Sequence, residues 1–176
     1  MTIIDCGNCN GRCCRNYRIA LCPLDIINIQ KTTGLNPIDF IELESVDNMW
    51  SMFPDVFIDK NYYYLTLRRQ KDERCIFARE IENRKLTCSI HGNHPLACRL
   101  YPFKLTIDNR VAKRGDVDCH GIFEKKKIDG ELKILQEAIH HEIHFFEQKA
   151  HDWNKSGGGT IEELMKYIII SDDLFN

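Results

Sequence analysis

Apolar residues recur most regularly in the last third of the chain. Between residues 131 and 153 their spacing is that of an α-helix, which predicts one long helix with a single buried stripe. The stripe consists of Leu135, Ala138, Ile139, Ile143, Phe146, Ala150 and Trp153. Three glycines at 157–159 interrupt the pattern. Thr160 and Glu163 have the spacing of a capping box, which predicts a final helix through Ile170.

Two shorter helices are predicted near the N-terminus. An amphipathic segment begins at Pro23, a residue favoured at the first helical position, and Gly34 suits its end. Asn36 and Pro37 form a second start signal, because asparagine caps helices and proline often follows the cap. The pattern extends this second helix over residues 38–44.

Short antiparallel strands are predicted for the middle of the chain. Residues 62–67 are rich in aromatic and branched side chains, which favour a strand. Residues 75–78 and 85–90 predict one hairpin, and residues 103–107 and 111–113 predict another. Helices therefore flank a central part made of small strands.

Length and composition are typical of one domain, and we predict a single domain over residues 1–176. A chain of 176 residues buries roughly 70% of its unfolded surface. The net charge of only −2 gives no strong attraction to nucleic acid or to an anionic membrane, and Arg68–Arg69 is interpreted as solvated surface. Neither a signal-peptide pattern nor an apolar run of membrane-spanning length occurs, so we expect a cytosolic protein.

Nine cysteines change this picture. Cytosolic thiols stay reduced, so such a number indicates metal or redox chemistry rather than a disulfide framework. Eight of them form an N-terminal and a central set: Cys6, Cys9, Cys13 and Cys14, then Cys75, Cys88, Cys98 and Cys119. Eight thiols suffice for two four-thiolate sites, which could hold two zinc ions, two [4Fe-4S] clusters or one of each.

The two cysteine sets lie far apart in sequence, so folding must bring them together. We therefore predict an α+β fold in which small antiparallel strands and cysteine-rich loops enclose one or two metal centres, with N-terminal and C-terminal helices packed around them. Residues 6–121 would form the metal-binding core and residues 122–176 a helical extension. Adjacent Cys13 and Cys14 would point apart, and could serve two different centres.

The cysteine motifs resemble those of the YkgJ-type cysteine-cluster family, which has a zinc- or iron-chelating domain. The resemblance covers about residues 6–121. It depends on the motifs Cys6-x-x-Cys9-x-x-x-Cys13-Cys14, Cys75-Ile76-Phe77, Cys88-Ser89-Ile90-His91, His94-Pro95-x-x-Cys98-Arg99-Leu100-Tyr101-Pro102-Phe103 and Cys119-x-Gly121. The third cysteine follows the second one residue later than is usual in the family. The resemblance implies metal chelation by these cysteines.

Three roles remain open from the sequence. An iron-sulfur protein with a redox or protein-modification role is favoured, because zinc sites often include histidine whereas cubane clusters prefer four thiolates. The alternative is a zinc-stapled structural or interaction module without catalysis. A similar module in flagellin lysine N-methylases implies a third role, S-adenosylmethionine-dependent protein lysine methylation. The residues do not decide whether the protein is an enzyme, and a protein partner or protein substrate suits each role.

Other candidate ligands have simpler interpretations. Cys22 belongs to no motif and is expected to be a small buried apolar residue. The late helix carries His140, His144, Glu147 and His151 on one face, which we interpret as solvated. His91, His94 and His120 lie beside proposed ligands and could support them. Arg99 could hydrogen-bond a thiolate or form a surface salt bridge.

Overall fold

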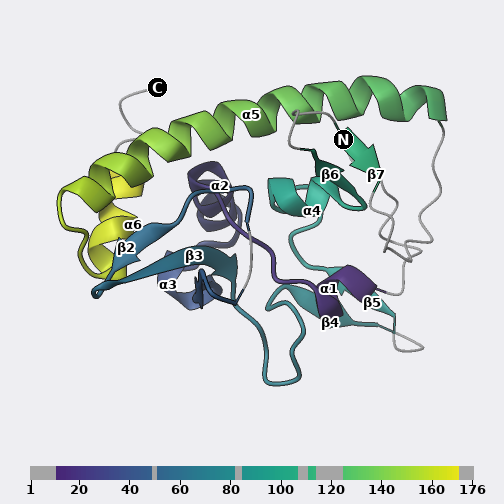
Figure 1. The fold of residues 1–176 in the computed structure, drawn as a ribbon. Coiled ribbons are helices and arrows are strands. Elements are labelled where there is room, and N and C mark those ends of the chain that lie inside the picture. Colours follow the sequence, from purple (N-terminus) through teal and green to yellow (C-terminus); the bar gives the residue numbers. More distant parts are fainter. Residues whose placement is uncertain (1–10, 49–50, 82–84, 107–110, 114–124, 171–176) are drawn as a thin grey trace.

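The computed structural model describes residues 11–48, 51–81, 85–106, 111–113 and 125–170. Helix α5 runs along the length of the molecule, and the smaller elements lie below it in two groups (Figure 1). One group, beneath the C-terminal half of α5, contains a three-stranded sheet and three helices. The other, toward its N-terminal half, contains two short helices and two hairpins.

The three-stranded sheet is antiparallel, with β3 in the centre of the order β1-β3-β2. Its strands are β1 (Ile41–Ser45), β2 (Val56–Ile58) and β3 (Asn61–Leu67). The predicted strand at 62–67 is thus confirmed. The helix predicted over 38–44 is wrong beyond Phe40, because the chain from Ile41 pairs with β3, and this tertiary pairing overrides the local helical pattern.

Helices of the same group follow their sequence signals. They are α2 (Pro23–Thr33), α3 (Pro37–Phe40) and α6 (Ile161–Ile170). The side chain of Asn36 accepts a hydrogen bond from the Ile38 N–H, as expected of a helix cap. Thr160 and Glu163 form the predicted capping box, with bonds of 2.8 and 3.3 Å.

Helix α5 (Lys125–Lys155) has 31 residues and contacts α2, α4 and β2. At 1.5 Å per residue it is about 46 Å long. Its C-terminal end is fixed to β2, because Trp153 Nε1 donates to the Phe57 carbonyl at 2.9 Å and Asn154 Oδ1 accepts from the Phe57 N–H at 2.7 Å. No helix in the described ranges combines the length and the apolarity needed to cross a bilayer.

The second group consists of short elements. They are α1 (Arg12–Asn16), β4 (Ala78–Glu80), β5 (Leu86–Cys88), α4 (Leu96–Leu100), β6 (Phe103–Leu105) and β7 (Val111–Lys113). Both predicted hairpins are present, although β4 begins at Ala78 rather than at Cys75. The chain turns before this strand, where the Ala78 N–H donates to the Cys75 carbonyl at 2.9 Å. The sequence did not predict α1 or α4.

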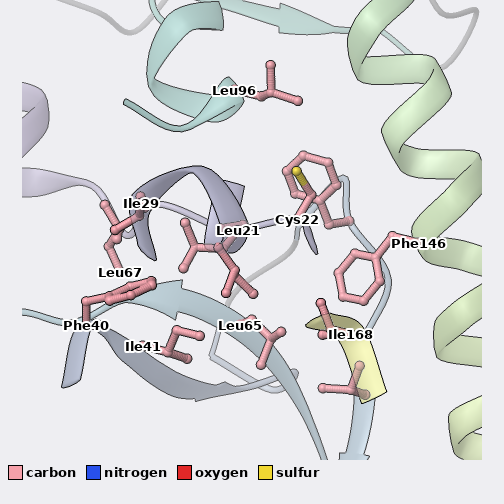
Figure 2. Close-up of a cluster of buried hydrophobic side chains, with 14 of the residues drawn as sticks. Leu21, Cys22, Ile29, Phe40, Ile41, Leu65, Leu67, Leu96, Phe146 and Ile168 are labelled. Carbon is pink, nitrogen blue, oxygen red and sulfur yellow. The ribbon is translucent and has the colours of Figure 1, made fainter. Parts of the chain in front are cut away.

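Buried apolar residues from both groups of elements, and from α5, form one hydrophobic cluster. Phe146 points from α5 into this cluster, whose floor is the sheet (Figure 2). Of the predicted stripe on α5, Leu135, Ile139, Phe146, Ala150 and Trp153 are buried. A single domain over 1–176 remains a prediction, and this shared cluster supports it.

We call the elements α2, α3, α6 and β1–β3 the core region, and α1, β4, β5 and α4 the cysteine region. The core region is packed by large apolar side chains that are fully buried, among them Phe40 and Leu65. In the described part of the chain, Cys13, Cys14, Cys88 and Cys98 all lie in the cysteine region, and Cys75 lies just before β4. The metal centres expected within this fold are not shown by the structure.

Candidate metal centre

Four cysteines from four separate segments come together beside the core. Cys14 lies in α1, Cys75 precedes β4, Cys88 ends β5 and Cys98 lies in α4. Each of the four thiols is near enough to act electrostatically on the other three. The sequence placed three of them in one set, and the structure adds Cys14 to that set.

Burial and mutual repulsion keep these thiols protonated when no cation is bound. Burial raises the pKa of Cys75 to about 11, and the charges of Cys14 and Cys88 add to this effect. Burial also raises the pKa of Cys98 well above its ordinary value, with further contributions from Cys75, Cys14 and Cys88. The pKa of Cys88 rises through burial and through Cys14. A bound metal cation would stabilise the thiolates and release their protons.

The vicinal pair at the start of α1 is closely spaced. The Cys13 and Cys14 sulfur atoms lie 3.9 Å apart. The hydrogen bond between Cys14 and Cys13 is the main cause that raises the pKa of Cys14, followed by burial, whereas Arg15 acts in the opposite direction. This short separation shows that the two thiols do not point apart, as was expected. That they serve two different centres held close together stays a prediction.

Backbone contacts join the two cysteine-bearing loops. The Cys75 N–H donates to the Cys14 carbonyl at 2.8 Å, which fixes α1 against the turn before β4. The β4–β5 register places Ala78 opposite Cys88. Gly11, in a left-handed conformation with φ of 68°, lies so close to β5 that an added Cβ would be 2.6 Å from Leu86 Cβ. The start of α1 therefore lies directly on the hairpin.

A buried carboxylate connects α4 to the core region. Asp25 Oδ1 accepts from the Leu96 N–H at 2.9 Å, and Oδ2 accepts from the Cys22 N–H at 3.1 Å. Burial raises the Asp25 pKa to about 6, although both hydrogen bonds act to lower it. Because Leu96 begins α4, Asp25 orients the helix that carries Cys98. This role was not predicted from the sequence, although an acidic residue in the first turn of a helix is a signal of capping.

Backbone amides also face the thiols. Cys75 accepts hydrogen bonds from the N–H groups of Phe77 and Ala78, and Cys88 accepts from Ile90. Such bonds stabilise the thiolate and oppose the effect of burial. Loops that offer amide hydrogens to a sulfur are therefore suited to hold it as a charged ligand.

The two arginines that were interpreted as solvated surface differ: Arg68 is exposed, as expected, whereas Arg69 is largely buried. Arg69 has a side chain only 9% exposed. It donates to the Tyr17 carbonyl at 2.8 Å and to the Arg15 carbonyl. Arg68 donates to the Ile38 and Ile41 carbonyls at 2.7 and 3.1 Å. The earlier interpretation is wrong for Arg69, because α1 covers its guanidinium group.

The histidines beside the cysteines interact with one another. The His91 and His94 rings stack with centroids 5.3 Å apart, and His94 Nδ1 accepts from the Gly92 N–H at 3.2 Å. Burial is the main cause that lowers the pKa of His94 to about 4, and His91 and Arg99 contribute to the same decrease. His94 is therefore neutral at physiological pH. Arg99 lies near this histidine, and no contact of Arg99 with a thiolate is shown.

The predicted solvated face of α5 is confirmed in part. His144 and Glu147 are exposed and lie 3.5 Å apart, and His151 is exposed. His140 differs, because it is partly buried and its Nε2 has no hydrogen-bond partner among the described residues. Cys22 is fully buried in the hydrophobic cluster, where an apolar role was expected (Figure 2).

The remaining predicted ligands cannot be placed in this centre. Cys6, Cys9, Cys119 and neighbouring His120 lie outside the described residues. Within the described ranges, no three His, Cys, Asp or Glu side chains form a ready coordination shell. A metal bound by Cys14, Cys75, Cys88 and Cys98 would therefore draw their sulfur atoms closer together. The residues fit such a metal, because they supply four soft donors in a partly buried setting that offers amide hydrogens to thiolates.

Comparison with known families agrees with this donor set. A family model matches residues 5–127, under the description "CxxCxxCC: Putative zinc- or iron-chelating domain". The chain belongs to this family. The family's description names zinc and iron, the two metals that the sequence leaves open. Searches of curated proteins and of solved structures found no match.

Proposed function

We propose that Cys14, Cys75, Cys88 and Cys98 bind one metal centre, and that this centre is a [4Fe-4S] cluster with a redox or protein-modification role. The convergence of these four thiols from separate segments carries the proposal. Membership of the CxxCxxCC family supports metal chelation in general. Four thiolates are the ligand set that cubane clusters prefer.

Zinc is the second candidate, because a four-cysteine site also suits a structural zinc ion. In that case the metal would staple the short elements of the cysteine region, and the protein would serve as an interaction module. Cys6, Cys9, Cys13 and Cys119 remain proposed ligands on the sequence motif alone. We do not propose a methylase-like activity, because no described residue indicates a site for S-adenosylmethionine.

The described residues have defined tasks in this proposal. The apolar cluster beside the cysteines excludes water, and the amides of Phe77 and Ile90 stabilise thiolate charge. A cluster of this kind gains or loses one electron at a time. Electron transfer requires a partner that donates or accepts the electron, and we propose a protein in this role, or a protein substrate.

Anaerobic purification followed by iron, sulfide and zinc analysis tests the proposal. We expect iron and acid-labile sulfide in the wild type, with absorbance near 400 nm. Cys75→Ser should lose most of both, because one of four ligands is removed. Cys22→Ala is the matched control, since Cys22 lies in the hydrophobic cluster, and it should keep its metal.

Two outcomes would change the proposal. Zinc in place of iron and sulfide would establish the stapled module instead. A wild-type protein free of both metals, after anaerobic purification and reconstitution, would refute the proposed centre.

A further inference from the structure

Two consecutive side chains shortly after β3 bond to the two cysteine-bearing loops. Arg69 is the first. Its guanidinium group donates to the carbonyls of Arg15 and Tyr17, at the C-terminal end of α1. A helix of five residues leaves most of its last carbonyls without a partner inside the helix. Arg69 bonds to the Arg15 carbonyl inside α1 and to the Tyr17 carbonyl just after it, and so fixes the segment that carries Cys14.

Gln70 is the second side chain, and it holds the other loop. Its amide Nε2 donates to the Cys75 carbonyl at 2.9 Å and to the Ala78 carbonyl at 3.0 Å. These two carbonyls lie at the start and the end of the turn before β4. Gln70 also closes a tight turn of its own backbone, with its N–H bonded to the Arg74 carbonyl at 2.7 Å.

We propose that Arg69 and Gln70 are positioning residues of the metal centre, which hold the Cys14 and Cys75 segments at a fixed separation before metal binds. This inference rests on the proposed function. Among the described residues, the hydrogen bonds of both side chains go to backbone carbonyls of the loops that carry the thiols, and none goes to a sulfur atom.

The physical reason is preorganisation. Metal binding is tighter when its ligands are already oriented, because less conformational entropy is lost on binding. Groups that orient ligands commonly change metal affinity by about 10- to 100-fold when they are removed. The antiparallel bridge between Arg69 and Cys75 adds a backbone link between the dipeptide and the second loop. One rigid dipeptide therefore sets the distance between the loops.

The chain offers a close control for this inference. Arg68 is the neighbouring arginine, but its side chain donates to the Ile38 and Ile41 carbonyls, outside both cysteine loops. Arg68→Met and Arg69→Met thus each remove one guanidinium group, at adjacent positions of the chain. Gln70→Glu keeps the size of the side chain but replaces its amide donors by a carboxylate that faces carbonyl oxygens. Arg69→Lys retains a cationic donor and should rescue part of the effect.

Cobalt(II) titration of the metal-free proteins tests the inference, because cobalt absorbance reports thiolate coordination. We expect Arg69→Met and Gln70→Glu to weaken cobalt binding about 10- to 100-fold. Arg69→Lys should fall between Arg69→Met and wild type, and Arg68→Met should bind as wild type does. Equal affinity in Arg69→Met and wild type, or an equal loss in Arg68→Met, would overturn the positioning role.

A second readout separates this inference from the proposed function. If the wild type binds neither cobalt nor iron, the proposed metal centre is refuted. The positioning role can still be tested by measuring how fast iodoacetamide alkylates Cys14 and Cys75 in each variant. Faster alkylation of both thiols in Arg69→Met and Gln70→Glu than in Arg68→Met would support the positioning role. Rates equal to those of wild type would overturn it.

Discussion

The core region and the cysteine region are stabilised by different interactions. In the core region β3 has seven residues and α2 has eleven, and apolar side chains between them are fully buried. In the cysteine region β4 and β5 have three residues each, and α1 and α4 have five. Elements this short are marginal on their own. They are held by the side chains of Asp25, Arg69 and Gln70 that bond to backbone groups.

The difference indicates where a metal would stabilise the protein. Apolar burial is present in the core region whether or not metal is bound. In the cysteine region the buried thiols repel one another as thiolates, and a cation would convert this repulsion into ligand bonds. We therefore expect metal removal to loosen the cysteine region and to leave the core region folded.

The largest effect is expected from the core region. Phe146→Ala removes a side chain that is 1% exposed, and should lower the free energy of unfolding by about 3–5 kcal/mol. Because the lost contacts are apolar, the loss should be the same in metal-free and metal-loaded protein, measured by urea denaturation. Phe145→Ala is the control at a partly exposed neighbour and should cost less. A loss that metal loading abolishes would contradict the separation of the two regions.

The next effect comes from the carboxylate between the regions. The pKa of Asp25 is raised from 3.8 to about 6 by burial, so the folded state binds a proton more tightly than the unfolded chain. Stability from this group is fully present below pH 3.8 and is lost as pH rises through about 6. The expected change is about 2–3 kcal/mol between pH 4 and pH 7.

Comparing the stability of wild type with that of Asp25→Asn separates the effect of Asp25 from that of the other carboxylates. In metal-free protein, the unfolding free energy of wild type relative to Asp25→Asn should fall by that amount as pH rises from 4 to 7. Urea denaturation at several pH values measures it. If the unfolding free energies of the two proteins change in parallel with pH, ionisation of Asp25 does not destabilise the folded state.

The smallest effect compares two glycines with the same backbone conformation. Gly11 has φ of 68° and Gly34 has φ of 71°, so alanine is strained at both positions, at roughly 1 kcal/mol each. A Cβ at Gly34 meets nothing within 4 Å, whereas one at Gly11 meets Leu86. Gly11→Ala should therefore cost more than Gly34→Ala, about 1–3 kcal/mol in all.

The two glycine variants should also differ in metal content. Gly11→Ala should loosen the loop that leads to Cys14 and lose metal to a chelator faster, while Gly34→Ala should retain it. Thermal unfolding and chelator competition measure the two effects. Equal stability and equal metal retention in both variants would show that the contact between Gly11 and Leu86 does not hold the loop.

The sequence predicted the core region better than the cysteine region. Proline at position 23, glycine at 34 and the capping box at Thr160 are local signals, so the helices that they bound were predicted from pattern alone. Strand β1 was not, because its partner β3 lies more than fifteen residues later and the local pattern at 38–44 is helical. Long-range pairing of this kind leaves no local signal.

For the candidate site, the cysteine motifs name the expected ligands, which stays a prediction, but they do not give the arrangement of those ligands. Cysteine motifs indicated which residues carry the chemistry, since thiols in such density have few other uses. They did not show that Cys14 lies with Cys75, Cys88 and Cys98, because spacing does not define how distant loops meet. Asp25, Arg69 and Gln70 were missed for a related reason: they act on backbone carbonyls and amides, which the sequence does not distinguish.

The length of α5 limits how this protein can be shortened in the laboratory. A fragment trimmed to residues 5–127, the stretch matched by the family model, would lack nearly all of this helix. Phe57 would lose Trp153 and Asn154 as partners, and Val56 and Ile58 would be uncovered. Such a fragment would be prone to aggregate, so metal analysis of it would report on damaged material. Spectroscopy on this family member therefore calls for the untrimmed polypeptide.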